Sequence, residues 1–458
     1  MIGQTKTKLL FTDTFMSPTR ITHFPSSHNR ASSVLKAIQT WNASLSPEFR
    51  DEKFARMARS PLDFYQGTNH LFWHDMGEDW RIHRFGGEKT LAWIVGDAHV
   101  MNMRASINEE GELVYASHRF DDAIIADYQY DLWRMAISIV LVAQKGSGYA
   151  RSKQKAALRA FVDSYADAMA VFAENKRETR HYFTRQTTDG KLRKFLNRIQ
   201  TKNIRGELIN KWTYETEGKR QLNLEHSKLN PVSDLKRREI ITAIAPYLET
   251  LENELPLAPT ASFSVLDVAK GEHDAVSAMG DPRFFLLVRW GDETSEHLRL
   301  LDVKRQDKPT AYHYLNHQAR LQYKQNFMHD AFRYVVAYRS LTKNNDDFLG
   351  WMNLTDGVFS VREYASLREP FPLYTLTKAK HLINLAAQWG RILATHHARA
   401  VLESESFLPP YAIEKQITKR IAKARKPFRR MISELAFSYA EQVQTDWETF
   451  AESIKSAA

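Results

Sequence analysis

Apolar positions recur at helical spacing over most of the chain, and alternation typical of strands is confined to two shorter stretches. We expect helices over residues 32–45, 48–58, 155–175, 192–212, 234–251, 310–338, 377–400, 412–424 and 429–456. After Asp131 the run to residue 143 is apolar on nearly every side, which is typical of a helix enclosed by protein. The pattern therefore predicts a helix-rich protein.

Short runs rich in β-branched and aromatic residues predict the strands. Residues 90–95 form a buried strand that ends at Gly96-Asp97, and 103–107 with 113–120 form a hairpin. The composition changes near residues 256–259, and further strands are expected over 263–268, 283–290, 297–303 and 358–364. The fold class expected from this order is α+β.

Composition excludes several classes of protein. The hydrophobic fraction of 43% is enough to build a core, so wholesale disorder is excluded. Cysteine is absent, which excludes disulfide frameworks, thiolate zinc sites, iron-sulfur clusters and thiol nucleophiles. The first 15 residues hold too short an apolar run for a signal peptide, and the longest apolar stretch, 135–143, cannot span a bilayer. We expect a soluble, cytoplasmic protein that does not bind membranes.

Positive charge is concentrated in two windows of a chain whose net charge is +10. Residues 176–205 hold ten Lys or Arg and 411–430 hold eight, against three acidic residues in total. Such windows could bind an anionic ligand, but they also carry apolar residues at helical spacing, so basic outer faces of helices are the simpler interpretation. Zinc-finger, helix-turn-helix and glycine-aromatic RNA motifs are missing, so nucleic acid is not the expected partner.

The densest cluster of polar residues lies in the loop after the first strand. Asp97 and Asn102, five positions apart, match a unit of phosphoryl transfer in which the Asp accepts the proton of the acceptor hydroxyl and the Asn holds magnesium. Magnesium prefers oxygen ligands, and Asp121 and Asp122 add carboxylates after the hairpin. His99 in the same loop is interpreted as an imidazole that orients Asp97.

Three consecutive motifs carry a resemblance to known enzymes. Gly-Asp-x-His-x-x-Asn (96–102), Phe-Asp-Asp-Ala (120–123) and Asp-Tyr-Gln-Tyr-Asp-Leu (127–132) resemble the catalytic and metal-binding segments of aminoglycoside-phosphotransferase-type and protein-kinase-like enzymes. Together with Arg-Ser-Pro-Leu-Asp-Phe-Tyr-Gln-Gly (59–67), they resemble more closely the bacterial domain of unknown function 2252 family, over roughly residues 55–400.

The resemblance implies a two-lobed, protein-kinase-like fold in circularly permuted order, because the catalytic loop precedes the β-rich segment. Residues 1–255 would form a helical lobe with the catalytic and metal loops, 256–365 a β-rich nucleotide-binding lobe, and 366–458 helices that return to the first lobe. The implied activity is magnesium-dependent transfer of a phosphoryl group from ATP to a hydroxyl acceptor that the sequence does not identify.

The resemblance also implies a role for each site residue. Asp97 would be the base, Lys304 would contact the α and β phosphates, and Asp131 would anchor the catalytic loop. The metal would be held by Asn102 with either Asp121 or Asp122. The hinge at 361–364, with Glu363 and Tyr364, would meet adenine.

This chain departs from the kinase pattern in four places. Arg119 stands where a metal-binding Asp precedes Phe120, and Gln66 stands where the resembling family usually has Arg. Between residues 269 and 279 the only glycine is Gly271, so a glycine-rich phosphate loop is poorly formed. Residues 308–329 contain no acidic residue that could pair with Lys304.

Other interpretations stay open from the sequence. Gly-Asp-x-His also opens the metal site of binuclear metallophosphoesterases, but their downstream motifs are missing. The chain could be a kinase-like module of weak or no activity that binds nucleotide or an anionic partner. Lys304 could pair with Asp302 on the same strand, or face water from an edge strand. The pair His396-His397 is expected to pack or cap a helix rather than bind metal.

Overall fold

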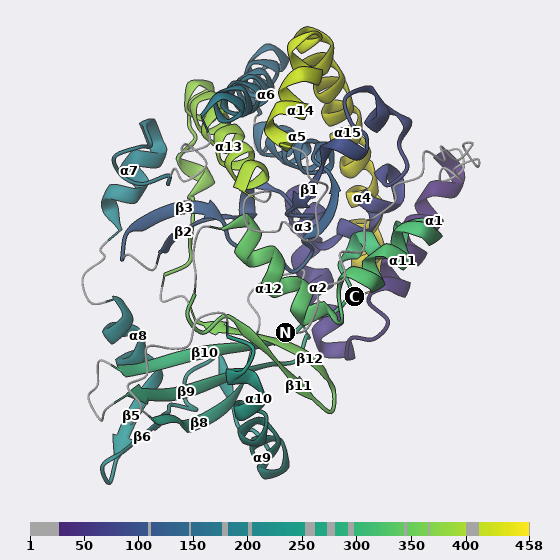
Figure 1. Ribbon diagram of the computed structural model, residues 1–458. Helices are drawn as coiled ribbons and strands as arrows, with labels where there is room; N and C mark the ends of the chain where they lie inside the picture. Colours follow the sequence, from purple (N-terminus) through teal and green to yellow (C-terminus); the bar gives the residue numbers. More distant parts are fainter. Residues whose placement is uncertain are drawn as a thin grey trace.

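The computed structural model describes residues 27–108, 111–145, 148–175, 182–199, 204–251, 262–272, 280–291, 297–342, 346–364, 367–399 and 412–457 (Figure 1). A six-stranded sheet lies at one end and most of the helices lie at the other, so the fold is a mixed α+β fold. The domain boundary expected at 256 lies outside the described residues.

Four short helices begin the described chain: α1 (Ser27–Trp41), α2 (Pro47–Met57), α3 (Pro61–Gly67) and α4 (Asn69–Met76). Serine followed by proline sets two of the starts. The Ser46 hydroxyl accepts a hydrogen bond from the amide of Phe49, and the Ser60 hydroxyl accepts one from Asp63. These caps separate α2 and α3, so the chain turns instead of forming one long helix.

Short strands then frame the loops that carry the polar motifs. Strand β1 (Leu91–Ile94) pairs antiparallel with β4 (Ile124–Asp127). Between them, β2 (Met103–Ile107) and β3 (Leu113–Ser117) form the expected hairpin, and β13 (Glu369–Pro370) joins it from far along the chain. Helix α5 (Gln129–Gln144) follows β4 and is buried along nearly its whole length, which confirms the enclosed helix predicted there.

The six-stranded sheet is antiparallel, with the order β11-β12-β10-β9-β8-β7. Its strands are β7 (Leu229–Asn230), β8 (Ser262–Gly271), β9 (Arg283–Gly291), β10 (Leu298–Arg305), β11 (Gly350–Leu354) and β12 (Gly357–Glu363). Strand β10 lies between β9 and β12, so Lys304 does not stand on an edge strand.

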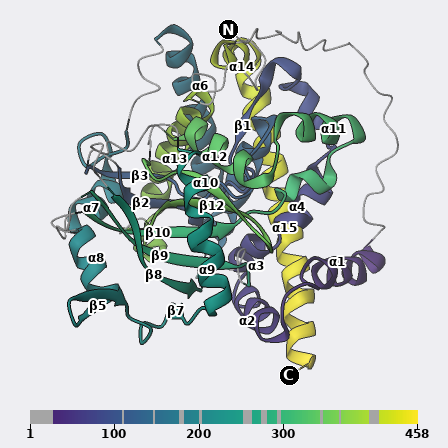
Figure 2. The same cartoon turned by 60° about the horizontal axis from the view of Figure 1, so that its bottom comes forward.

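Separate apolar clusters cover the two faces of this sheet. Helices α9 (Asp234–Thr242) and α10 (Ile244–Leu248) pack on the outer face, where Val303 and Val361 are buried, and Figure 2 shows them lying across the strands. On the inner face, Trp212 at the end of α8 (Ile204–Trp212) packs against Phe285. The hairpin of β5 (Thr213–Thr216) and β6 (Lys219–Leu222) continues this cover. Thus α8, α9 and α10, which precede residue 256, pack with the sheet.

Five further helices belong to the helical region: α6 (Arg151–Glu174), α7 (Gly190–Arg198), α13 (Ala379–Arg399), α14 (Ile413–Ala422) and α15 (Arg425–Ala457). Helices α13 and α6 are in intimate contact at Gly390, where an added Cβ would lie 2.2 Å from the backbone oxygen of Phe161. Glycine is therefore required for this approach.

Side-chain caps divided one predicted helix. The helix expected over 310–338 is instead a 3₁₀ turn (Thr310–Tyr314) followed by α11 (His317–Asn326) and α12 (Asp330–Leu341). Asn316 accepts a hydrogen bond from the amide of Ala319, and His329 accepts one from Phe332, so each starts a new helix.

The helices expected over 192–212 and 234–251 are also each divided in two. The sequence pattern did not predict α3, α4, β4, β5, β6 or β11. Strand β11 precedes the Asp356-Gly357 turn that leads into β12, and this dipeptide is a hairpin signal that could have found it.

The basic windows belong partly to amphipathic helices, as expected. Leu192 and Leu196 of α7 are buried, and so are Ile413 and Ile417 of α14, while residues 176–181, 200–203 and 411 lie outside the described part. Within that part, no helix combines the length and the hydropathy needed to cross a membrane.

Candidate active site

A cleft of about 1200 Å³ opens between the six-stranded sheet and the helical region. The end of β10 supplies Lys304 on one side, and the segment after the β2–β3 hairpin supplies Asp121 and Asp122 on the other. Helices α1 and α2 contribute Trp41 and Lys53 to its wall. The predicted lysine and the predicted acidic pair thus meet at one opening.

Lys304 and Asp121 form an ion pair across this cleft. The Lys304 ammonium group donates to Asp121 Oδ1 at 2.7 Å, and the Gln306 amide lies 3.3 Å from the same oxygen. Burial favours the neutral acid, but the charges of Lys304 and Arg119 outweigh it and hold the pKa of Asp121 well below its usual value. The interpretation of Lys304 as a partner of Asp302 was wrong, because Asp302 binds Arg283 instead.

Asp122 is fixed by neutral donors. Its Oδ1 accepts a hydrogen bond from the amide of Thr310 at 2.6 Å, and its Oδ2 accepts one from the Asn69 side chain at 3.1 Å. Burial, followed by the charge of Asp97, raises the pKa of Asp122. Two adjacent aspartates therefore have opposite pKa shifts, because only Asp121 faces cations at close range.

Asp97 is held by a buried arginine from the apolar helix α5. Arg134 Nε donates to Asp97 Oδ1 at 2.7 Å, and Arg134 is completely buried. His99 Nε2 lies 3.5 Å from the other oxygen, in agreement with an orienting imidazole. Burial alone would raise the pKa of Asp97, but the charges of Arg134 and His99 lower it to about 2. Asp97 is therefore ionised at neutral pH.

Asn102 joins the two loops of the site. Its side-chain oxygen accepts a hydrogen bond from the amide of Arg119 at 3.0 Å, and its side-chain nitrogen donates to the carbonyl oxygens of Arg119 and Asp97. All of its polar atoms thus have backbone partners, which hold the Asp97 loop against the segment before Asp121.

Gly96 permits close contact between the same two loops. Its φ is +73°, and a Cβ there would lie 2.0 Å from the backbone oxygen of Asp122. Both the conformation and the space exclude a side chain.

Asp131 anchors the Asp97 loop from the first turn of α5, as predicted. Its two oxygens accept hydrogen bonds from the amides of Val95 at 2.7 Å and Gly96 at 3.0 Å. His397 Nε2 lies 3.2 Å from the same carboxylate, and its Nδ1 lies 2.8 Å from the Tyr165 hydroxyl. The expectation that this histidine packs rather than binds metal agrees with these contacts.

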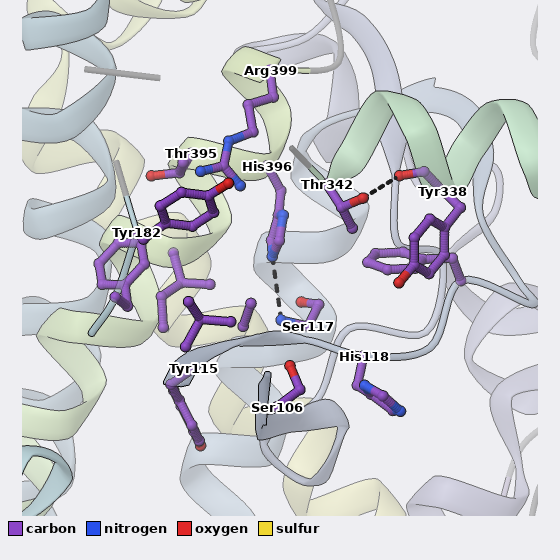
Figure 3. Close-up of a pocket in the computed structure, with 15 residues that line it drawn as sticks. Ser106, Tyr115, Ser117, His118, Tyr182, Tyr338, Thr342, Thr395, His396 and Arg399 are labelled. Atoms are coloured by element: carbon purple, nitrogen blue, oxygen red, sulfur yellow. Dashed lines mark hydrogen bonds between the residues drawn. The ribbon is translucent and has the colours of Figure 1, made fainter. Parts of the chain in front are cut away.

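His396 lines a separate small pocket with His118 and Tyr338, which lie to the right of His396 in Figure 3. His396 Nε2 accepts a hydrogen bond from the amide of Ser117, and burial lowers the pKa of His396 to about 3. Among the described residues, no group of three or more acidic or histidine side chains is arranged to hold a metal ion.

Arg333 on α12 binds the backbone of the segment that carries Asp121 and Asp122. It donates to the backbone oxygens of Ala123 at 2.7 Å and Asp121 at 2.8 Å. Helix α12 thus orients the acidic segment by binding the backbone oxygens of that segment. The carboxylate of Asp121 in this segment then pairs with Lys304.

Glu363 and Tyr364, the predicted adenine contacts, do not line the cleft. Glu363 pairs with Arg205 at 2.7 Å, and Tyr364 packs against Trp212 and Arg368. The structure therefore brings Asp121, Asp122 and Lys304 to the cleft. The loop of Asp97 and Asn102 is held against the acidic segment, but neither of these two side chains lines the cleft. Glu363 and Tyr364 lie in a separate environment.

The sequence interpretation missed three residues of the site. Arg134 could have been found, because a single arginine in an otherwise apolar helix needs a buried anion. Lys53 and His70 line the cleft, and His70 is buried and stacks on Trp41 with ring centroids 4.9 Å apart. They belong to the short helices α2 and α4, and no local pattern reveals where these helices pack.

A comparison with known protein families agrees with the family that the sequence motifs resemble. Residues 45–453 match the family described as an uncharacterized protein conserved in bacteria (DUF2252), and the chain belongs to this family. Neither a curated protein nor a solved structure matches it.

Proposed function

We propose that this DUF2252 protein is a kinase-like phosphotransferase that moves a phosphoryl group from ATP to a hydroxyl acceptor with the help of magnesium. The observation that carries the proposal is the 2.7 Å contact between Lys304 and Asp121 across an open cleft. Phosphoryl transfer depends on a cation for the phosphates opposite carboxylates for the metal, and both are present at one opening.

The arrangement of elements supports a permuted kinase-like fold. Counted along the chain from β8 and leaving out the two-residue β7, the antiparallel sheet has the order 4-5-3-2-1, with α12 between the third and fourth strands. Lys304 stands on the third strand, the position of the nucleotide lysine in kinases. The Asp97 loop precedes this sheet in sequence, as a permutation requires.

The acidic residues suit magnesium only in part. Asp121 Oδ2 has Arg119 Nε as a neighbour at 3.7 Å, whereas both oxygens of Asp122 and the oxygen of Asn102 already accept hydrogen bonds. Magnesium in nucleotide sites is commonly bound by one or two carboxylates together with phosphate oxygens. Asp121, assisted by Asp122, would hold the ion, and bound magnesium would neutralise charge on the phosphates.

A second candidate is a nucleotide-binding module with weak turnover. The observation that favours it is the Arg134–Asp97 ion pair, because a carboxylate with a pKa of about 2 is a poor acceptor for a proton. Under this alternative the cleft binds nucleotide, but Asp97 serves only to hold its loop.

Calorimetric titration of ATP, with and without magnesium, tests the proposal. We expect wild-type protein to bind and Lys304→Met to lose at least about tenfold in affinity, because a charged partner of the phosphates is removed. Lys270→Met is the matched control, because Lys270 is an exposed residue on β8 of the same sheet.

Transfer from labelled ATP to a metabolite extract separates the two candidates. Transfer that disappears in Asp97→Ala supports the enzyme, and binding without transfer supports the module. No ATP binding by the wild-type protein would contradict both.

A further inference from the structure

Three arginines lie on the inner face of the six-stranded sheet, on the same side as Lys304. In the strand register Arg283 is opposite Lys304, and Arg362 is opposite Asp302, which stands two residues before Lys304. Side chains alternate along a strand, so all four point to one face. Arg368 follows β12 and reaches the same carboxylate, Asp302.

Asp302 is in direct contact with two of these three arginines. Arg283 binds Asp302 through two hydrogen bonds of 2.6 and 2.7 Å, and the nearest nitrogen of Arg368 is 3.5 Å away. Arg362 is 8% exposed and makes no ion pair with any described residue.

Arg362 has no counter-ion in direct contact, although the carboxyl groups of Asp302 and Asp346 lie near enough to raise its pKa. Tyr334 and Tyr338 beside it stay protonated, because burial raises the pKa of both phenols. The carboxyl group of Asp346 nearby accepts hydrogen bonds from the backbone amides of Phe348 and Glu363. Arginine does not lose its proton in proteins, so its charge persists.

The β2–β3 hairpin adds positive charge from the opposite side. His118 has its pKa lowered well below the usual value by burial and by the charges of Arg368, Arg362, Arg104 and Arg119. Its Nε2 is buried without a hydrogen-bond partner in the described structure. His118 therefore lies near arginines from two parts of the fold, Arg362 and Arg368 at the sheet and Arg104 and Arg119 at the hairpin.

Such a set of arginines fits phosphate. A buried charge without a counter-ion is unfavourable, and the planar guanidinium group matches phosphate oxygens in pairs. The sequence explains why phosphates would need arginine partners. Gly271 is the only glycine among residues 269–279, so the backbone amides of this segment cannot approach phosphates as those of a glycine-rich loop would. Arg362 and Lys304 stand two positions apart in the register, about 6.5 Å along the strand, which a chain of phosphates can bridge.

We propose that Arg283, Arg362 and Arg368 bind the phosphate chain of the donor beneath the sheet, in place of a glycine-rich loop, and deliver its end to Lys304. The inference rests on the proposed function for the identity of the donor as a nucleotide. The arginine site itself recognises a chain of phosphates with or without the nucleoside.

Binding of magnesium-ATP and of inorganic tripolyphosphate, measured by calorimetry, tests this. We expect both to bind the wild-type protein and Arg362→Met to weaken both by about tenfold or more. Arg299→Met is the matched control, because Arg299 lies on the opposite face of β10 beside Glu363, and it should bind like wild type.

The outcomes separate the two proposals. Tripolyphosphate binding that depends on Arg362, without ATP binding, supports the arginine site and contradicts the nucleotide function. ATP binding that is unchanged in Arg362→Met contradicts the arginine site. If that variant does not fold, the half-buried Arg368→Gln replaces it, and tripolyphosphate must raise the unfolding temperature of wild type more than that of Arg368→Gln; equal shifts overturn the proposal.

Discussion

The carboxylate of Asp131 accepts a hydrogen bond from the backbone amide of Gly96 at 3.0 Å, and so joins the first turn of α5 to the loop that carries Asp97. The neighbouring amide of Val95 binds the other oxygen. One buried side chain thus fixes the backbone of the candidate catalytic loop.

Asp131→Asn should lower the free energy of unfolding by about 2–3 kcal/mol. The asparagine side chain has only one acceptor oxygen, whereas the two buried backbone N–H groups of Val95 and Gly96 each need one. Urea unfolding followed by circular dichroism measures this. Asp234→Asn is the control, because Asp234 is an exposed residue in the first turn of α9, and it should change stability by less than about 1 kcal/mol. Equal effects of the two changes would show that Asp131 is not an anchor.

Arg134→Met should destabilise the protein by about 3–5 kcal/mol, since it leaves Asp97 buried without its counter-charge. The double variant with Asp97→Asn should recover part of this loss in the same unfolding experiment. Arg159→Met removes an exposed ion pair with Asp163 and should have little effect. Additive losses from the two site substitutions would contradict the coupling.

The ion pair of Arg134 and Asp97 predicts how the free energy of unfolding falls at acid pH. The pKa of Asp97 is about 2 in the folded protein, against an ordinary value of 3.8 for an aspartate carboxyl group, so its stabilising contribution is complete above pH 3.8 and is lost as the pH falls toward 2. Unfolding free energies of wild type between pH 5 and 2.5 should therefore fall more steeply than those of Asp97→Asn. Parallel curves would show that Asp97 is not strongly ion-paired.

Gly96→Ala should be far more destabilising than Gly111→Ala, although both glycines have positive φ, +73° and +76°. The backbone oxygen of Asp122 occupies the space that a Cβ would need at Gly96, while nothing lies within 4 Å at Gly111. We expect about 1 kcal/mol for Gly111→Ala from conformation alone and at least about 3 kcal/mol for Gly96→Ala. Similar thermal unfolding of both variants would contradict the close contact of the two loops.

Lys53→Met should stabilise the protein at neutral pH. Burial, partly offset by the charge of Asp281, lowers the pKa of Lys53 from 10.5 to about 8, so the charged form is unfavourable in the folded state by up to about 3 kcal/mol. The unfolded chain binds more protons between pH 8 and 10.5, and wild-type stability should rise over that interval. The variant should lack this rise, and the exposed Lys36→Met should keep it.

The local pattern was enough to predict most elements of the fold. The hairpin at 103–117, the enclosed helix after Asp131 and the central strands follow from periodicity and turn residues, which depend only on neighbours in the chain. Predicted helices were divided where a single side chain caps a new helix, as Asn316 and His329 do. One hydrogen bond decides such a cap, whereas the prediction depends on the average hydrophobic pattern of a segment.

The sequence by itself was enough to select Asp97, Asn102, Asp121 and Asp122 as candidates for chemistry, because they stand in closely spaced motifs, and the family resemblance added Lys304. Only the tertiary structure decided their partners. Lys304 and Asp121 are 183 positions apart, and the 37 positions between Asp97 and Arg134 end inside an apolar helix. Ion pairs form only between charges a few ångströms apart. The pattern of hydrophobic and polar residues along the sequence does not show which distant segments will come that close.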